Sequence, residues 1–525
     1  MKKKAVVGLV ATGIVAMGSL FSTSLPTYAA QEKIAVKSSV TANTPYNVFN
    51  KKIDVKTTTP IKHVVVIFGE NVSFDHYFGT YPYALNIKGE PKFTPKTSTP
   101  EVNNLLTPKD YNGTQPDIAK TNLITNNPNA ANPVRLDRSQ AMTADMDHAY
   151  HDEIAAVNGG KMDKFVETVG RGSNPNIVMD YYDGNTVTAL WNYAQNFAMS
   201  DNSFGTTYGP STPGALNLIS GETHGATLYD KDGKQTGDVK NEFENGTVTG
   251  DPDPLFDKAG KGLKVKMDET NKNVGDLLNA KGITWGWFQG GFADTTAKHT
   301  NIEGASVTDY NPHHEPFQYY KSTANPDHVT SSSPDLIGKT DQANHQYDMK
   351  DFWTAVDNGN LPSVSYLKAP NYQDGHAGYS DPLDEQHFIV DTINHLQKTP
   401  EWKDTAVVIA YDDSDGWYDH VYGPNNGQTE DSGKAGYGPR LPLLVVSPYA
   451  KGNFVDHTVT DQTSILKFIE DNWNLGRIGG TSLDAKAGSL ANMFDFNHGP
   501  RNKKLFLDPT TGQPVKAIND TNNEH

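Results

Sequence analysis

The sequence has no cysteine among its 525 residues. Disulfide bonds and lipid attachment through an N-terminal cysteine are therefore excluded, so the core, together with any bound metal, must hold the fold. After the N-terminal apolar stretch there is no second long apolar segment, and residues 519–525 are all polar. We expect a protein that is exported without a stable membrane anchor.

Three sequence signatures of hydrolases and nucleotide-binding proteins are also missing. The chain has no G-x-S-x-G nucleophile elbow, no G-x-x-x-x-G-K-[ST] phosphate-binding loop and no H-E-x-x-H zinc helix. These absences argue against a Ser-His-acid hydrolase, a P-loop protein and a zinc metalloprotease.

Positive charge is scarce relative to negative charge. The chain has 45 Lys and Arg residues against 62 Asp and Glu residues, a formal net charge of −17. Loss of Lys2, Lys3 and Lys4 with an N-terminal leader would change it from −17 to −20. Such a molecule has no general attraction to nucleic acid or to an anionic membrane. We expect no nucleic-acid partner, and an anionic substrate must be captured by a local positive site.

The N-terminus has the three parts of a secretory signal peptide. Basic residues at 2–4 precede an apolar stretch at 5–21, and residues 27–29 form an acceptable cleavage site. We predict a signal peptide over 1–29, an extended polar leader over 30–60 and secretion to the extracellular space. The alternative is an uncleaved membrane anchor, which the short, glycine-containing stretch disfavours.

Two short apolar runs each end in a pair of oxygen-bearing side chains. The pairs are Glu70-Asn71, after residues 63–69, and Asp412-Asp413, after residues 406–411. Such runs are typical of parallel strands buried on both faces, and ligands bind beyond the carboxyl ends of these strands. Three of the four side chains carry negative charge, which favours a bound cation. Because the ligands are hard oxygens, we predict one divalent metal ion: calcium, magnesium or manganese.

Alternating strand and helix patterns favour one large α/β domain over 61–525. Apolar residues at helical spacing predict helices over 187–194 and 384–396, and a third helix capped by Asp461. Further strands are predicted over 283–288, 363–367 and 441–447. Polar stretches near 83–132, 222–272 and 321–345 are interpreted as long loop insertions.

The segment 204–219 has a glycine- and threonine-rich approach followed by an apolar helical start. Ser211 or Thr212 is suited to cap this helix, and Pro213 is suited to its first position. The Ser211 hydroxyl would then lie at a helix N-terminus, where free backbone N–H groups favour a phosphate. An ordinary Ser/Thr cap is the alternative, and spacing alone does not exclude it.

Histidines gather in three polar, turn-rich stretches, which include His148, His313, His314 and His376. A histidine can bind phosphoryl oxygens or donate a proton to a leaving group, although most surface histidines do neither. Three such clusters in an acidic chain are better explained as a local anion site.

Other charged residues lie near the same predicted strands. Asp419 and His420 are interpreted as orienters of Asp412, with direct metal ligation or a simple turn as alternatives. Arg440 precedes the strand 441–447, so its guanidinium could hold a carboxylate ligand or a substrate phosphate. A surface salt bridge is the alternative for Arg440.

Taken together, four segments resemble the bacterial phosphoesterase family: 61–79, the G-P-S-T-P segment at 209–213, 411–416 and 438–442. That family holds the non-zinc-type phospholipases C and the respiratory-burst-inhibiting acid phosphatase. The resemblance covers about the whole chain after the leader, with the motifs in the expected order. It implies an α/β/α sandwich of the alkaline phosphatase-like superfamily with a mainly parallel central sheet.

The resemblance also implies roles for individual residues. The metal would be held by Glu70, Asn71, Asp412 and Asp413. Catalysis would fall to Ser211 as nucleophile and to His148, His314 and His376, with His376 as first choice for the proton donor. Substrate contacts would come from His313, Arg440 and Thr212. The chain has Pro213-Gly214-Ala215 where the family has P-N-R, which puts in doubt the substrate contacts of that arginine.

These observations predict a secreted, metal-dependent phosphoesterase that hydrolyses phosphate esters or phospholipids through a phosphoserine intermediate. Monoester and diester substrates are not distinguished, because the same nucleophile and metal serve both. The rival hypothesis is a catalytically silent secreted binding protein in which the metal only stabilises a surface loop. The oligomeric state is not predicted.

Overall fold

The computed structural model describes residues 56–116, 120–424, 436–502 and 504–516 of the chain. The predicted signal peptide and most of the predicted leader lie outside these residues. Within the described ranges, no helix is both long enough and apolar enough to cross a membrane.

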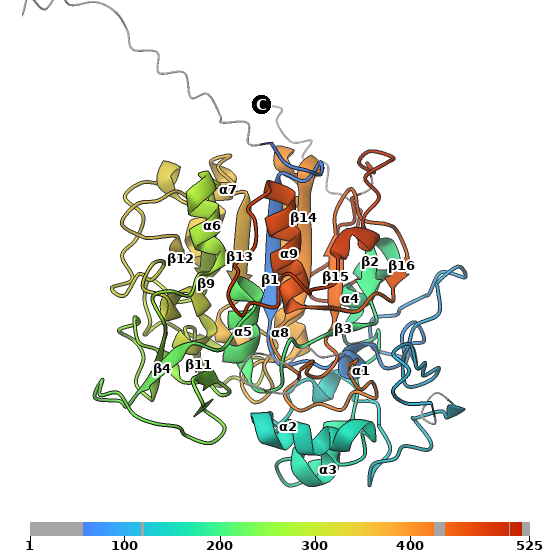
Figure 1. Cartoon of the computed structure of the whole chain (residues 1–525). Helices are drawn as coiled ribbons and strands as arrows, with labels where there is room; N and C mark the ends of the chain where they lie inside the picture. The colour runs from blue at the N-terminus through green and yellow to red at the C-terminus, as the bar shows by residue number, and fades with distance from the viewer. Residues whose placement is uncertain (1–55, 117–119, 425–435, 503, 517–525) are drawn as a thin grey trace, which may run out of the picture. The chain divides into compact units, whose positions relative to one another are not determined.

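An eight-stranded sheet is central to the fold, in the order β12-β9-β13-β1-β14-β15-β2-β16 (Figure 1). Its strands are β1 (His63–Gly69), β2 (Ala198–Ser200), β9 (Trp285–Gln289), β12 (Gln346–Asp348), β13 (Val364–Lys368), β14 (Thr405–Tyr411), β15 (Leu443–Val446) and β16 (Phe454–Asp456). All pairs in this sheet are parallel except those that β15 makes with β14 and β2. The predicted α/β class with a mainly parallel sheet is confirmed.

β1 lies between β13 and β14 and is parallel to both. The register pairs Ile67 with Leu367 and Gly69 with Tyr411. β14 is buried along its whole length and β1 at all but its first residue, as expected for apolar runs covered on both faces. The carboxyl ends of the three strands therefore meet at one edge of the sheet.

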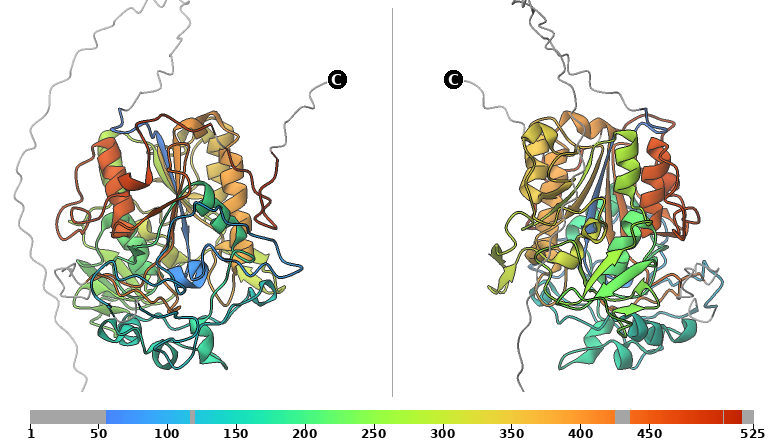
Figure 2. Two further views of the ribbon diagram at one scale, coloured as in Figure 1. Left: turned by 90° about the vertical axis from the view of Figure 1, so that its right-hand side faces the viewer. Right: turned by 60° about the vertical axis from the view of Figure 1, so that its left-hand side comes forward.

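Helices cover both faces of the sheet (Figure 2). On one face, α5 (Ser211–Ser220) contacts α6 (Val274–Lys281) and α9 (Gln462–Trp473). On the other, α8 (Pro382–Leu396) contacts α4 (Thr188–Asn196), and His395 of α8 stacks on Trp353 of α7 (Met349–Asp357). The two helical layers and the sheet bury one large apolar core.

The three predicted helices are present as α4, α8 and α9. Asp461 caps α9, because its side chain accepts a hydrogen bond from the N–H of Ser464. The strands predicted over 283–288, 363–367 and 441–447 correspond to β9, β13 and β15. Local apolar periodicity was sufficient to locate these elements, since each has one face or both in the core.

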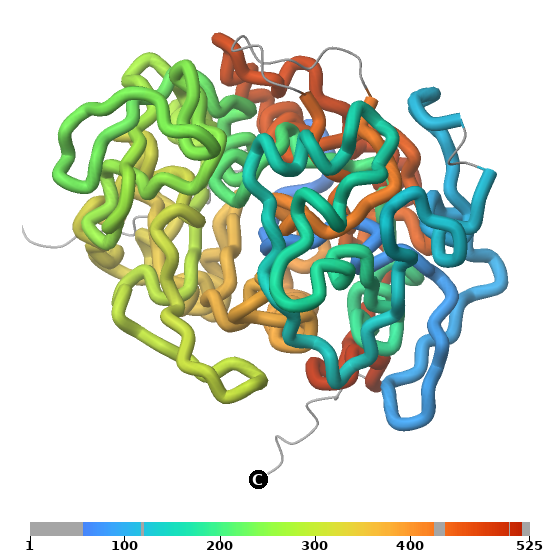
Figure 3. The backbone as a smooth tube through the Cα atoms, turned by 90° about the horizontal axis from the view of Figure 1, so that it is seen from below, coloured from blue at the N-terminus to red at the C-terminus, as the bar shows by residue number. Residues whose placement is uncertain are grey.

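Loops and short elements lie beyond the carboxyl ends of the strands (Figures 1 and 3). They include three helices, α1 (Phe74–Phe78), α2 (Tyr150–Val157) and α3 (Phe165–Thr168). The stretch near 222–272 has short strands of its own, namely β4 (Ala226–Tyr229), β5 (Phe243–Glu244), β6 (Thr247–Val248), β7 (Asp253–Pro254) and β8 (Lys264–Met267). Two further pairs are β3 (Ser203–Phe204) with β17 (Thr460–Asp461), and β10 (Lys298–Thr300) with β11 (Ser306–Thr308).

Candidate active site

The carboxyl ends of β1 and β14 bring the four predicted metal ligands together. Asp412 Oδ1 accepts hydrogen bonds from the backbone N–H groups of Asn71, at 3.0 Å, and Asp413, at 2.8 Å. Glu70 reaches the same place, because the Lys368 ammonium contacts Glu70 Oε1 and lies 3.6 Å from Asp412 Oδ2. All four predicted ligands are buried. They form one cluster of carboxylate and amide side chains, hereafter the oxygen cluster.

Ser211 faces the oxygen cluster. Its Oγ donates a hydrogen bond to Glu70 Oε2 at 3.0 Å, and the residue is 2% exposed. α5 begins at Ser211, with Pro210 as its N-cap and no side-chain capping bond. The predicted cap at Ser211 or Thr212, with Pro213 in the first helical position, is therefore wrong. The Ser211 hydroxyl does not cap the helix because it bonds instead to a residue at the end of β1.

Thr212 bonds to a different set of residues. Its Oγ1 lies 3.3 Å from Tyr319 Oη and donates to the backbone carbonyl of His313 at 3.4 Å. The Thr212 N–H donates to Asp251 Oδ1 at 2.9 Å. The predicted phosphate site on free N–H groups of this helix therefore loses one donor.

Gly214 allows α5 to lie directly against the end of β14. A Cβ built at this position would lie 2.2 Å from the Asp412 carbonyl oxygen, which is closer than a real contact allows. The glycine in the middle of Pro213-Gly214-Ala215 therefore has a packing reason, because a side chain at this position would clash with the backbone of Asp412.

The donor set fits a divalent cation. Three buried oxygens have no hydrogen-bond partner among the described residues: Asn71 Oδ1, Asp412 Oδ2 and Asp413 Oδ2. Unpaired buried oxygens are costly, and oxygens of this kind are the ligands that calcium, magnesium and manganese prefer. The residues present therefore fit the predicted ion.

The charges of the oxygen cluster also favour a cation. Burial, together with the neighbouring Asp412 carboxylate, raises the pKa of Glu70 and of Asp413 well above the usual carboxyl value. Burial acts in the same direction on Asp412, but the Lys368 charge and local hydrogen bonds outweigh it and lower the pKa of Asp412. Two of the three carboxyl groups therefore resist ionisation unless more positive charge is nearby.

His314 and His313 are neighbours in sequence but occupy different environments. His314 is buried, its Nδ1 lies 3.4 Å from Glu70 Oε1, and its Nε2 accepts from Asn311 Nδ2 at 3.0 Å. Burial lowers the pKa of His314 well below its ordinary value, so this imidazole is neutral. His313 is partly exposed, with its Nε2 4.0 Å from Asp251 Oδ2. The structure therefore brings His314, rather than His313, to the oxygen cluster.

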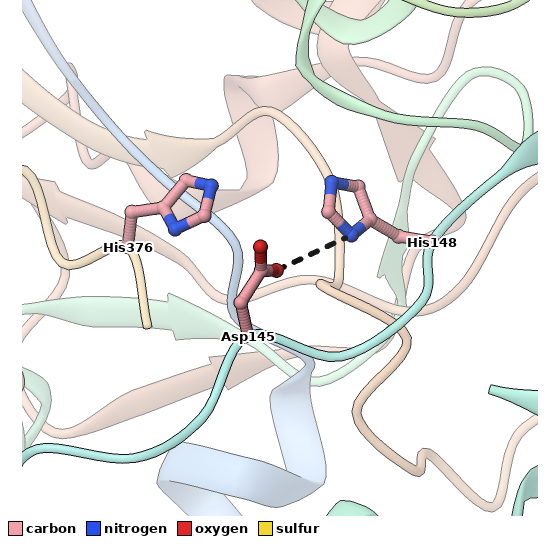
Figure 4. A group of neighbouring side chains, drawn as sticks. All are labelled: Asp145, His148 and His376. Atoms are coloured by element: carbon pink, nitrogen blue, oxygen red, sulfur yellow. Dashed lines mark ion pairs between the residues drawn. The ribbon is translucent and has the colours of Figure 1, made fainter. Parts of the chain in front are cut away.

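His148 and His376 flank Asp145, and the ligand atoms of the three side chains lie within 4.8 Å of one another (Figure 4). His148 Nδ1 is 3.2 Å from Asp415 Oδ1, and the same oxygen accepts a hydrogen bond from Asn71 Nδ2 at 3.2 Å. These contacts connect the histidines to the oxygen cluster. An aspartate with two histidines is also a set of metal-ligand types, so this group is a second place where a cation fits.

The same two histidines differ in proton affinity. Burial lowers the pKa of His376 to about 4. Burial also disfavours the charged form of His148, but the charges of Asp413 and Asp415 raise the pKa of His148 well above its ordinary value. Of the two histidines, His148 therefore has the higher proton affinity. The choice of His376 as proton donor is not supported by this environment, and His148 is better suited to that role.

Arg440 lies in a separate buried ionic cluster. It is 0% exposed, and its guanidinium donates to Asp75, Asp419 and the backbone carbonyls of Asn103 and Asp201 at 2.7–3.1 Å. These contacts use all of its N–H groups. The predicted substrate-binding role of Arg440 is therefore wrong, because no N–H donor remains for a phosphate. The alternative interpretation of Arg440 as part of a surface salt bridge is also wrong, because the residue is buried.

Asp419 and His420 belong to the same buried ionic cluster. His420 Nδ1 lies 2.6 Å from Asp75 Oδ2, and Arg440 Nη2 lies 3.1 Å from Asp419 Oδ2. Their side chains therefore tie this loop to α1, which contains Asp75, and the interpretation of Asp419 and His420 as orienters of Asp412 finds no support in these contacts.

Replacing Arg440 with methionine is expected to lower the free energy of unfolding by about 3–5 kcal/mol, because Asp75 and Asp419 would remain buried without their partner. Denaturant unfolding followed by circular dichroism measures this change. Lys164→Met is the control: it removes an exposed ion pair with Glu167 and should cost less than about 1 kcal/mol. Equal effects of the two substitutions would contradict a buried role for Arg440.

Sequence reasoning missed Lys368, the last residue of β13, whose ammonium contacts the oxygen cluster. It also assigned no role to Asp415, which links Asn71 to His148. A signal for Lys368 was available, since it is the first charged side chain after a predicted buried strand, as Glu70 and Asp412 are. No comparable signal pointed to Asp415.

A model described as "Phosphoesterase family" matches residues 61–476. The non-hemolytic phospholipase C of Burkholderia pseudomallei (strain K96243) is 26% identical over 440 residues, covering 80% of this chain and 56% of that protein. The non-hemolytic phospholipase C of Pseudomonas aeruginosa (strain PAO1) is 25% identical over 483 residues, covering 86% and 60%. The chain thus spans less than two thirds of the length of each relative.

A solved structure of a protein in the alkaline phosphatase superfamily, from Vibrio parahaemolyticus, is also similar to this chain. The TM-score is 0.29 with 11% sequence identity, and the match covers 58% of this chain and 65% of that chain.

Proposed function

The chain belongs to the Phosphoesterase family, and on that basis we propose that it is a phosphoric ester hydrolase of the phospholipase C type. The observation that carries the proposal is the hydrogen bond between Ser211 Oγ and Glu70 Oε2, beside three buried oxygens of the oxygen cluster that have no hydrogen-bond partner among the described residues. A serine hydroxyl held against a cation site is the arrangement that metal-assisted phosphoryl transfer requires.

One divalent ion would be held by Glu70, Asn71, Asp412 and Asp413. When bound, it would supply positive charge that favours the Ser211 alkoxide and offsets charge on the phosphoryl oxygens. Assays with calcium, magnesium or manganese added separately would identify the ion.

The chain's own residues would perform the proton and group transfers. The Ser211 hydroxyl already donates a hydrogen bond to a Glu70 carboxylate oxygen, which would receive its proton. Ser211 Oγ would attack phosphorus, the bond to the leaving alcohol would break, and His148 would donate its proton to that alcohol. Water would then attack the phosphoserine: its proton would pass to His148, its hydroxyl oxygen would bond to phosphorus, and the bond to Ser211 Oγ would break as Glu70 returned the proton to that oxygen.

Neutral His314 would contact the phosphoryl group from the Glu70 side, and His376 from the His148 side. His314 is buried and His376 is half-buried, and desolvation lowers the pKa of both imidazoles, so they would act as hydrogen-bonding groups rather than as cations. Thr212 and His313 stay candidates for contacts with the rest of the substrate.

Phospholipids are the proposed substrates because the two relatives described above are phospholipases C. Secretion is proposed with this function, since the predicted signal peptide would take the enzyme out of the cell, where it would act on phospholipids in the surroundings. The catalytically silent binding protein is the rival, and it predicts no turnover under any condition.

The test is an assay of the purified protein with p-nitrophenyl phosphorylcholine, a diester, and p-nitrophenyl phosphate, a monoester. Each is measured with calcium, magnesium or manganese added separately. We expect kcat/KM for the diester to exceed that for the monoester by about tenfold or more, which corresponds to about 1.4 kcal/mol of transition-state discrimination. A preference for the monoester would point to an acid phosphatase, and no turnover of either would favour the binding protein.

A further inference from the structure

Lys368 is a buried lysine at the carboxyl end of the central strands. It is the last residue of β13, the strand that pairs with β1 on the side opposite β14. The residue is 1% exposed. Its ammonium group therefore lies near two side chains that follow other strands: Glu70 follows β1, and Asp412 follows β14, which pairs with the far side of β1.

The contacts of Lys368 are ionic. Its Nζ contacts Glu70 Oε1, lies 3.6 Å from Asp412 Oδ2 and stands 5.2 Å from the centre of the Phe68 ring. Among the described residues, Lys368 is the only lysine or arginine within 4.0 Å of a carboxylate in the oxygen cluster. A lysine is rarely buried without a partner, so these carboxylates account for its burial.

The two oxygens of the Glu70 carboxylate face different partners. Lys368 contacts Oε1, from which His314 Nδ1 also lies 3.4 Å, and Ser211 Oγ donates to Oε2 at 3.0 Å. Because the two oxygens of a carboxylate are fixed relative to each other, the ammonium on one side sets the direction in which the other faces the serine. Lys368 therefore acts on the proposed nucleophile through Glu70 without touching it.

We propose that Lys368 is a positioning residue and the built-in counter-cation of the metal site. It supplies one permanent positive charge to Glu70 and Asp412, orients Glu70 toward Ser211, and lowers the affinity of the oxygen cluster for divalent ions by competing for the same carboxylates. The inference rests on the proposed metal site and adds a residue that sets its charge. Without this lysine, the cluster would hold one more uncompensated negative charge and would attract a metal more strongly.

The experiment measures Mn²⁺ binding and thermal unfolding of the full chain in the absence of substrate. Lys368→Met removes the charge and keeps an apolar stem of similar length. We expect Lys368→Met to bind Mn²⁺ about tenfold or more tightly than the wild type. Without metal it should unfold at a lower temperature than the wild type, and Mn²⁺ should raise its unfolding midpoint by more than it raises that of the wild type.

Two further variants separate charge from packing. Lys368→Arg keeps the charge and should keep the Mn²⁺ affinity within about threefold of the wild type, since a guanidinium can pair with the same carboxylates. Lys451→Met is the matched control, because Lys451 also stands over an aromatic ring, at 4.4 Å from the Phe454 centre. It should leave Mn²⁺ affinity unchanged. Equal or weaker Mn²⁺ binding by Lys368→Met than by the wild type would overturn the proposal.

A double variant covers the case in which Lys368→Met does not fold. Glu70→Gln combined with Lys368→Met removes both charges of the pair, so it should fold where the single variant does not. Failure of the double variant as well would assign Lys368 to packing and overturn the proposal. If the wild type binds no Mn²⁺, the proposed metal site fails, and the stability comparison between single and double variants still tests the ion pair by itself.

Discussion

Ser211→Ala is expected to lower kcat for phosphate-ester hydrolysis by about 10⁴-fold or more while the protein stays folded. The substitution removes the only atom of Ser211 that can form a bond to phosphorus. It also removes the hydrogen bond to Glu70 Oε2, which should lower the free energy of unfolding by about 1 kcal/mol. Steady-state kinetics with the preferred p-nitrophenyl substrate and a thermal unfolding curve measure the two effects.

Ser220→Ala is the matched control for this experiment. Ser220 is buried in the same helix, but its Oγ donates to the backbone carbonyl of Leu216 and has no contact with Glu70. Its replacement should therefore change stability by a similar amount and leave kcat unchanged. Turnover by Ser211→Ala close to the wild-type rate would remove Ser211 as nucleophile, and a water molecule would have to attack phosphorus directly.

The strands that build the site could be predicted because they depend on local sequence. β1 and β14 are continuous apolar runs, so burial on both faces follows from composition alone, and the polar pairs that follow them must lie at a strand end. The same reasoning predicts that Glu70 and Asp412 lie close together, since the carboxyl ends of neighbouring parallel strands lie at one edge of the sheet. The geometry around Ser211 and Glu70 is consistent with that prediction.

The role of Arg440 could not be predicted from its neighbours. Its partners Asp75 and Asp201 are far away in the sequence, and only the folded loops bring them to the guanidinium. A sequence shows that an arginine precedes a strand, but it does not show whether the side chain points to the ligand side or into a buried ionic cluster. The Arg440 side chain is buried against these distant partners, and this contact rather than the local sequence determines its role.

The start of α5 was mispredicted, and the different proton affinities of the histidines could not be predicted, for a related reason. Ser211 has the side chain of a helix cap, but a tertiary bond to Glu70 takes its hydroxyl, and the helix begins one residue after Pro210. The high proton affinity of His148 comes from Asp413 and Asp415, which lie on another loop. Local motifs located these residues, whereas their chemistry depends on charges from elsewhere in the chain.

Removal of the metal is expected to lower kcat by about 10³-fold or more and to lower the unfolding temperature. The loss of rate follows because a cation at the oxygen cluster would supply several kcal/mol of transition-state stabilisation. The loss of stability follows because Asn71 Oδ1, Asp412 Oδ2 and Asp413 Oδ2 are buried and have no hydrogen-bond partner among the described residues, although Lys368 lies 3.6 Å from Asp412 Oδ2. Dialysis against a chelator, followed by kinetics and thermal unfolding before and after readdition of Mn²⁺, measures both effects.

Asp413→Asn tests whether the metal acts at the oxygen cluster rather than elsewhere. This substitution removes one charged ligand, so Mn²⁺ affinity should fall by about tenfold or more, and saturating Mn²⁺ should restore only part of kcat. Asp456→Asn is the control. Asp456 and Asp413 are each 4% exposed, and the Oδ2 atom of each has no hydrogen-bond partner among the described residues. A metal requirement that Asp413→Asn leaves unchanged would instead place the functional ion at Asp145, His148 and His376, where the side-chain spacing also fits a cation.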